Sequence, residues 1–127
     1  MKPKELQEFR MLYRVFKENC NRVAKILGDR EFEKDTHDIT YADEFHLEGD
    51  DVCWSGDEYW NYGGHEYHSG YFPAEYLVMD DDELREIVEK ENREYREAVE
   101  KRKEERKKQE KSERLELYEK LKKEFEK

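Results

Sequence analysis

Residues 100–114 contain no apolar side chain, and this stretch limits what the chain can fold into. Pairs of opposite charge four residues apart run through it, such as Glu104–Lys108 and Glu110–Arg114. Each pair stabilises a solvated helix by about 0.2–0.5 kcal/mol. A helix without an apolar face cannot join a hydrophobic core. We therefore expect a compact domain over residues 1–99 and a charged helical extension over 100–127.

The composition agrees with a small core, because 47% of the residues are charged and 35% are hydrophobic. No apolar run approaches the roughly 18 residues that a membrane span needs, and the N-terminus lacks the apolar region of a signal peptide. We expect a cytoplasmic protein that does not bind membranes. Cys20 and Cys53 form neither a CxxC motif nor a disulfide framework. Two buried, reduced thiols are expected.

Apolar residues recur every three or four positions along the first segment. They are Leu6, Phe9, Tyr13, Phe16, Cys20, Val23 and Leu27. Pro3 suits a first helical turn, and Gly28 suits the position after the last one. The pattern predicts a helix over residues 3–27 whose apolar stripe lies in the core.

Alternating apolar residues then indicate strands, beginning with Ile39, Tyr41, Phe45 and Leu47. Turn signals at Glu48–Asp51 and at Gly63-Gly64 separate them. We expect an antiparallel β-meander over 37–72, covered on one face by the first helix. The acids at 80–83 suit a helix N-terminus, and Leu84 to Val99 give an apolar face over 81–99. The fold class is therefore α+β: an N-terminal helix packed on a small antiparallel β-meander, followed by a long charged C-terminal helix.

The charges are unevenly distributed. Residues 1–28 carry seven Lys/Arg and three acids, for a net charge of +4. Residues 29–83 carry two Lys/Arg and 18 acids, for a net charge of −16. Residues 84–127 carry 16 Lys/Arg and 14 acids, for a net charge of +2. Between Lys34 and Arg85 there is no Lys or Arg. This segment repels phosphates and anionic lipids and attracts basic protein surfaces. The expected partner is a basic protein surface, and direct nucleic-acid binding is not expected.

Ten of the 17 aromatic residues lie between Tyr41 and Tyr76, in the same acidic segment. A small sheet needs about half of them in its core. Exposed Tyr and Trp beside carboxylates bind Arg and Lys through cation–π contacts and charge-assisted hydrogen bonds. The candidate contact residues are Asp50, Asp51, Asp57, Glu58, Trp60 and Tyr62.

Two other function classes remain open. A small-ligand or metal-cation module would use His65 and His68, with Cys53 as a further soft ligand. Residues three apart on a strand face opposite ways, so both imidazoles reach one ion only across a bulge or turn, and no zinc or EF-hand motif is present. We therefore assign no metal ligand and expect no cofactor. A hydrolase would use a His–carboxylate pair, since His37, His46, His65 and His68 all lie among acids. No nucleophile or phosphate-loop signature is present, so we assign no catalytic residue.

Three short stretches carry a resemblance: Gly63-Gly64, Phe72-Pro73-Ala74-Glu75-Tyr76-Leu77 and Asp80-Asp81-Asp82-Glu83-Leu84. Together they resemble a segment of small uncharacterised bacteriophage proteins, over about 25 of the 127 residues. The resemblance implies a host-takeover or defence-inhibitor role, such as that of an anti-CRISPR-like protein. Such an acidic inhibitor would act in the host cytoplasm as a nucleic-acid mimic, in the basic groove of a nucleic-acid-binding host protein.

An apolar stripe returns at the end of the last helix, at Leu117, Leu121 and Phe125. Its spacing is that of a coiled-coil seam. A homodimer through the C-terminal helix is the corresponding expectation.

Overall fold

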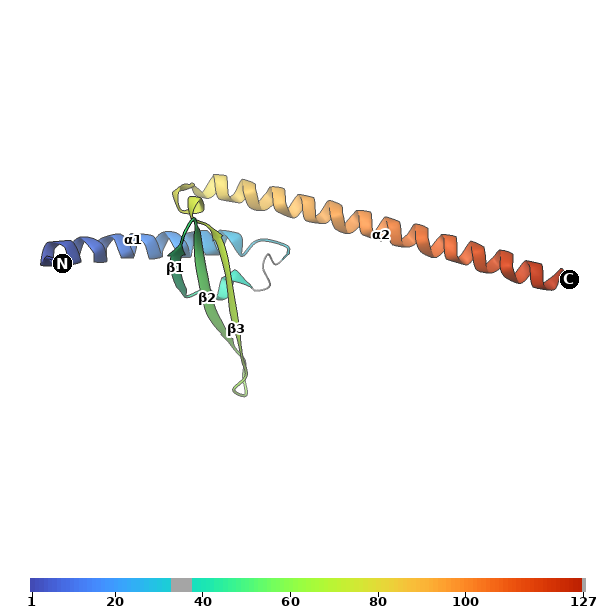
Figure 1. Cartoon of the computed structure of the whole chain (residues 1–127), viewed down its shortest axis with the longest axis horizontal. Coiled ribbons are helices and arrows are strands. Elements are labelled where there is room, and N and C mark those ends of the chain that lie inside the picture. Colours follow the sequence, from blue (N-terminus) through green and yellow to red (C-terminus); the bar gives the residue numbers. More distant parts are fainter. Residues whose placement is uncertain (33–37, 127) are drawn as a thin grey trace. The chain divides into compact units, whose positions relative to one another are not determined.

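The computed structural model describes residues 1–32 and 38–126 and has an α+β fold, which confirms the predicted class. In chain order the elements are α1 (Pro3–Leu27), the 3-10 helix η1 (Ile39–Tyr41), β1 (Glu44–Glu48), β2 (Asp51–Tyr59), β3 (His65–Pro73), the 3-10 helix η2 (Ala74–Val78) and α2 (Asp81–Phe125) (Figure 1). The chain divides into two units, Met1–Asn92 and Arg93–Lys127. The sheet and α1 belong to the first.

The three strands form one antiparallel sheet in the order β1-β2-β3, as predicted. The prediction is wrong for its first residues, because Ile39–Tyr41 form η1 and the first strand begins at Glu44. Phe45 of β1 lies opposite Trp54 of β2, and Trp54 lies opposite Gly70 of β3. Gly70 is required there, because an added Cβ would lie 2.7 Å from the Trp54 ring. The β2–β3 hairpin turns through Tyr62 and Gly63, both with positive φ, at 79° and 80°.

One face of the sheet, which we call the inner face, contributes Phe45, Val52, Trp54 and Phe72 to the core. The C-terminal half of α1 covers it with Cys20, Val23 and Leu27, all of them buried. The inner and outer residues alternate along β2, as the pleat of a strand requires. The core therefore lies between α1 and one face of a three-stranded sheet.

The prediction that the whole α1 stripe is core is correct only for its C-terminal half. Leu6, Phe9 and Tyr13 are exposed, whereas Cys20 and Leu27 are buried. The 25 residues of α1 extend for about 37 Å, while three strands spaced about 4.8 Å apart cover only about 10–15 Å. The helix is simply longer than the sheet is wide, so its N-terminal half has no sheet beneath it.

The start of α2 also belongs to the core. Leu84 and Val88 are buried, and the side chain of Asp80 accepts a hydrogen bond from the Glu83 N–H at 2.8 Å, the predicted acidic cap. The side chain of Asn92 connects α2 to the segment after α1 through two hydrogen bonds. It accepts one from the Glu31 N–H at 2.8 Å and donates one to the Asp29 carbonyl at 3.2 Å.

Beyond Asn92 the described residues of α2 are exposed, apart from the half-buried Val99. This agrees with the absence of apolar side chains from residues 100–114. No helix within residues 1–32 and 38–126 has the length and apolar character needed to cross a bilayer.

Candidate functional site

The second face of the sheet, which we call the outer face, carries the alternate residues of all three strands. Its carboxylates are Glu44 and Glu48 of β1 and Asp51 and Asp57 of β2. The register places Glu44 opposite Ser55 and Glu48 opposite Asp51. None of these side chains is buried, and the strands contain no Lys or Arg to neutralise them.

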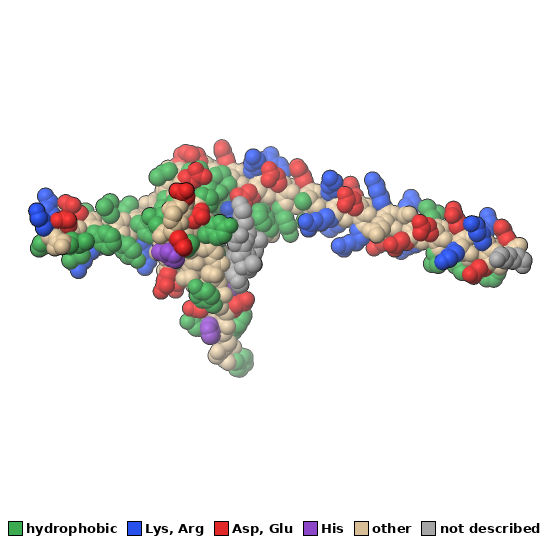
Figure 2. All heavy atoms as spheres, in the orientation of Figure 1, with side chains coloured by type: hydrophobic (Ala, Val, Ile, Leu, Met, Phe, Trp, Pro, Cys, Tyr) green, Lys and Arg blue, Asp and Glu red, His purple; other side chains and the backbone are tan. Residues whose placement is uncertain are grey.

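Tyrosines lie among these carboxylates. Tyr59, Tyr67 and Tyr71 are 75%, 58% and 52% exposed. Asp57 is the direct cross-strand neighbour of Tyr67, and the ring of Tyr59 stacks on His65 at 5.8 Å between centroids. Figure 2 shows hydrophobic, acidic and histidine side chains together on the hairpin, and basic side chains along both helices. The outer face is thus an exposed mixture of acids and aromatic rings.

The six predicted contact residues lie in four places, and Glu58 is on the inner face. Asp50 and Asp51 lie at the β1–β2 turn, while Asp57 lies near the opposite end of β2, about 20 Å from Asp51 at 3.3 Å per residue. Trp60 and Tyr62 lie at the tip of the β2–β3 hairpin, half and fully exposed. Asp51 and Asp57 share the outer face, but the structure does not bring all six together.

Glu58 points to the inner face and serves a structural purpose. Its carboxylate accepts a hydrogen bond from the Tyr41 hydroxyl at 3.0 Å and lies 2.9 Å from His68 Nε2. The Tyr41 ring stacks on the His68 ring, with centroids 5.0 Å apart. The hydrogen bond to Glu58, followed by the charge of Glu58, raises the pKa of Tyr41. Together these three side chains join η1 to the hairpin.

This arrangement bears on the hydrolase alternative. His68 and Glu58 do form a His–carboxylate pair, but His68 is buried and Tyr41 covers its ring. A general base needs to reach the proton that it removes from a substrate. The His68–Glu58 pair is therefore engaged within the chain, while the exposed pair of His46 with Glu48 lies on the outer face.

The other histidines are separated. His65 is exposed on the outer face, whereas His68 is buried on the inner face, so the predicted opposite orientation is confirmed and the two do not line one pocket. His46 lies on the outer face of β1, with Nε2 3.6 Å from Glu48 Oε2. His37 lies outside the described residues.

Both cysteines are free, as expected, but only Cys20 is buried. Burial raises the pKa of Cys20 to about 11. Cys53 is half-buried on the outer face, because it alternates with the core residues Val52 and Trp54. Desolvation, followed by the hydrogen bond that its thiol donates to Glu48, raises the pKa of Cys53. A thiol held protonated in this way is a poor nucleophile.

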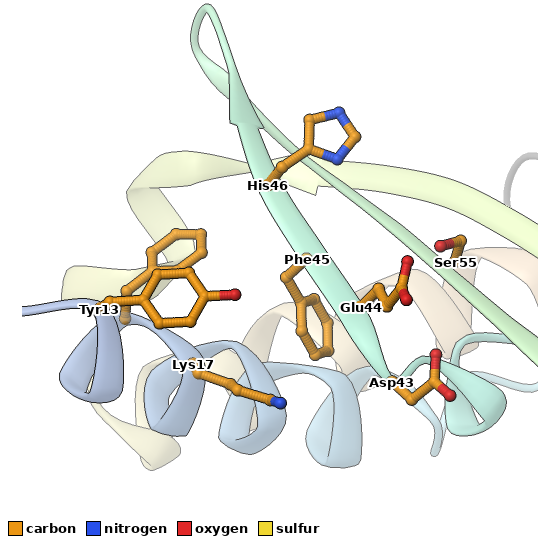
Figure 3. Close-up of a pocket in the computed structure, with 8 residues that line it drawn as sticks. Tyr13, Lys17, Asp43, Glu44, Phe45, His46 and Ser55 are labelled. Carbon is orange, nitrogen blue, oxygen red and sulfur yellow. The ribbon is translucent and has the colours of Figure 1, made fainter. Parts of the chain in front are cut away.

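A hollow of about 350 Å³ adjoins the outer face between α1 and the edge strand β1 (Figure 3). Tyr13, Phe16 and Lys17 line it from α1. Phe45 points toward α1, and His46 points the opposite way. Neighbouring residues of β1 therefore lie alternately in the core and on the outer face. The hollow extends the outer face toward the exposed half of α1.

Sequence reasoning did not name Glu44, Glu48, Tyr59, Tyr67 or Tyr71 as contact residues. The sequence does contain a pattern that identifies the tyrosines. Tyr59, Tyr67 and Tyr71 occupy odd-numbered strand positions, as do Asp51 and Asp57. Once strand pairing is known, parity alone assigns them to one face.

A scan against protein-family models and searches of the curated proteins and of the solved structures found no match.

Proposed function

We propose that this chain is a non-catalytic interaction protein whose outer sheet face binds a basic surface of another protein. The observation that carries the proposal is the composition of that face: four carboxylates and three exposed tyrosines on strands without Lys or Arg. The contact surface consists of Glu44, Glu48, Asp51, Asp57, Tyr59, Tyr67 and Tyr71, extended by Trp60 and Tyr62 at the hairpin tip.

The chemistry of this face matches guanidinium and ammonium groups. A carboxylate accepts two hydrogen bonds from an arginine, and a neighbouring tyrosine ring offers its negative face to the same cation. Asp57 and Tyr67 are direct cross-strand neighbours, so one arginine can contact both. Tyrosine adds contact area at a low cost in conformational entropy.

Two arginines of the first unit pair with acids away from the outer face, while Lys17 of α1 lines the hollow beside Glu44 at the edge of that face. Arg22 forms an ion pair with Asp81 at 2.7 Å, and Arg30 forms one with Glu91 at 3.2 Å. Both acids lie at α2 rather than on the sheet. Within residues 1–32 and 38–126, Glu48 pairs with the neighbouring His46, with Nε2 and Oε2 3.6 Å apart.

The hairpin tip supports the same reading. Tyr62 is fully exposed and has φ of 79°, a left-handed conformation that costs a bulky residue about 1–2 kcal/mol. Glycine or asparagine would relieve this strain. An exposed aromatic residue kept in a strained turn is consistent with a role in contacting a partner.

We extend the proposal to the kind of partner. A protein that binds nucleic acid exposes a basic groove, and the outer face would occupy that groove in place of phosphates. The resemblance to bacteriophage proteins favours a host nucleic-acid-binding or defence protein as the target. The exposed Leu117, Leu121 and Phe125 of α2 support the additional proposal of a homodimer, which sedimentation equilibrium tests directly.

The test compares two triple variants of equal charge. One carries Glu44→Gln, Asp51→Asn and Asp57→Asn on the outer face; the matched control carries Glu104→Gln, Glu110→Gln and Glu113→Gln on α2. Binding to a fluorescent arginine-rich peptide is measured by anisotropy at low and high salt. Loss of three exposed charge contacts, at about 0.5 kcal/mol each, weakens binding about tenfold. The control keeps the affinity of the unmodified protein, and its binding weakens as salt increases.

Equal affinities of the two triple variants would contradict the proposal. They would show that the peptide responds to net charge and not to the outer face. Double-stranded DNA serves as a further probe, and we expect it not to bind, because the face repels phosphates.

A further inference from the structure

Three side chains of different chemistry meet at one point of the outer face: His46 and Glu48 from β1 and Cys53 from β2. His46 and Glu48 are two residues apart, so they project from the same face of the strand. Cys53 is the direct cross-strand partner of His46. The antiparallel register therefore places an imidazole, a carboxylate and a thiol together.

Their ligand atoms all lie within 4.8 Å of one another. Cys53 Sγ is 3.3 Å from Glu48 Oε2, and His46 Nε2 is 3.6 Å from the same oxygen. In a tetrahedral zinc site with ordinary bond lengths, the edges between ligand atoms measure about 3.3–3.6 Å. The two measured distances lie within about 0.4 Å of the corresponding edges. His46 is exposed, so its ring is free to rotate and shorten the third distance.

We propose that His46, Glu48 and Cys53 form a binding site for a zinc-type divalent cation, with water in the fourth position. Thiolate and imidazole select such ions over calcium and magnesium, which require oxygen ligands. The negative outer face, with Asp51 beside Cys53 and no Lys or Arg on the strands, favours a cation. Binding displaces the thiol proton of Cys53, which passes to the buffer.

A second group, Glu58, Glu66 and His68, is a weaker candidate on the inner face. Both oxygens of Glu58 are already used, by the Tyr41 hydroxyl and by His68 Nε2. An ion there would have to break both contacts and displace the Tyr41 ring from His68. In the outer group, an ion would replace the thiol hydrogen bond and the His46 contact that Glu48 now makes, but all three side chains are exposed or half-buried, whereas His68 of the inner group is buried.

The site is tested by titrating the reduced protein with Co²⁺, which gives a thiolate-to-metal absorption band and tetrahedral d–d bands when a cysteine ligates it. We expect one equivalent to bind, and Zn²⁺ to displace it. Cys53→Ser should abolish the thiolate band, and His46→Ala should weaken binding at least about tenfold. The matched control, His65→Ala, removes an exposed outer-face histidine that is not a ligand and should leave binding unchanged.

Calorimetry with Zn²⁺ in two buffers of different ionisation enthalpy should give about one proton released per ion in the unmodified protein. In the Cys53→Ser variant, no proton should be released from residue 53 on zinc binding. Far-ultraviolet circular dichroism checks that each variant is folded. Absence of stoichiometric binding would overturn the inference, as would equal binding by Cys53→Ser. Neither outcome bears on peptide binding measured in the presence of a chelator, so the site and the proposed function can fail independently.

Discussion

Replacing Leu84 by alanine removes a side chain that is 0% exposed and holds the first turns of α2 against the core. Truncations of fully buried leucines cost about 2–5 kcal/mol, because apolar contact is lost and a cavity remains. We expect about 3 kcal/mol here. In a unit of this size each kcal/mol lowers the melting temperature by about 4–8 °C, so the shift should exceed 10 °C.

The matched control is Leu115→Ala, the same truncation on the same helix at a side chain that is 56% exposed and lies outside the proposed dimer stripe. It should change the free energy of unfolding by less than about 0.5 kcal/mol. The assay is urea unfolding followed by tryptophan fluorescence, in which the buried Trp54 reports on the core. Equal effects of the two substitutions, or a cost below about 1 kcal/mol for Leu84→Ala, would refute the assignment of the start of α2 to the core.

Two further predictions concern the inner face and the thiols. Tyr41→Phe removes the hydrogen bond to Glu58 and should lower the melting temperature. Because the pKa of Tyr41 is raised in the folded protein, the folded state holds its proton above pH 10 when the unfolded state has lost it. Stability should therefore fall as the pH rises beyond 10, and Tyr41→Phe should flatten that fall; an unchanged slope would contradict it. Titration with a thiol reagent should modify the half-buried Cys53 in the native protein, and Cys20, with a pKa of about 11, only after unfolding. Simultaneous modification of both would contradict the burial of Cys20.

The order and type of the two helices and three strands could be predicted from the sequence, whereas the alternation at Ile39 and Tyr41 was wrongly assigned to a strand and forms η1. The apolar stripe ending at Leu27 and the acids before Leu84 locate both helices. The strands follow from alternation, and the turns from Gly49 and Gly63. These signals are local, so they do not depend on how the elements pack.

The composition of the site depended on packing and was harder to predict. Asp57 and Glu58 are neighbours in sequence, but one faces solvent and the other binds Tyr41 and His68. The even-numbered residues of β2 face α1, because Val52 and Trp54 are among them and belong to the core. The proximity of His46 to Cys53 depends on the β1–β2 register. The exposure of Phe9 likewise follows from the limited width of the sheet, which no local pattern reveals.

The most direct test of the central claim maps the binding surface itself. Amide resonances of isotope-labelled protein are followed during titration with the arginine-rich peptide. We expect the largest changes at Asp51, Asp57, Tyr67 and the hairpin tip, and none in residues 100–114. Changes confined to α2, or spread evenly over all acidic residues, would contradict a binding site on the outer face of the sheet.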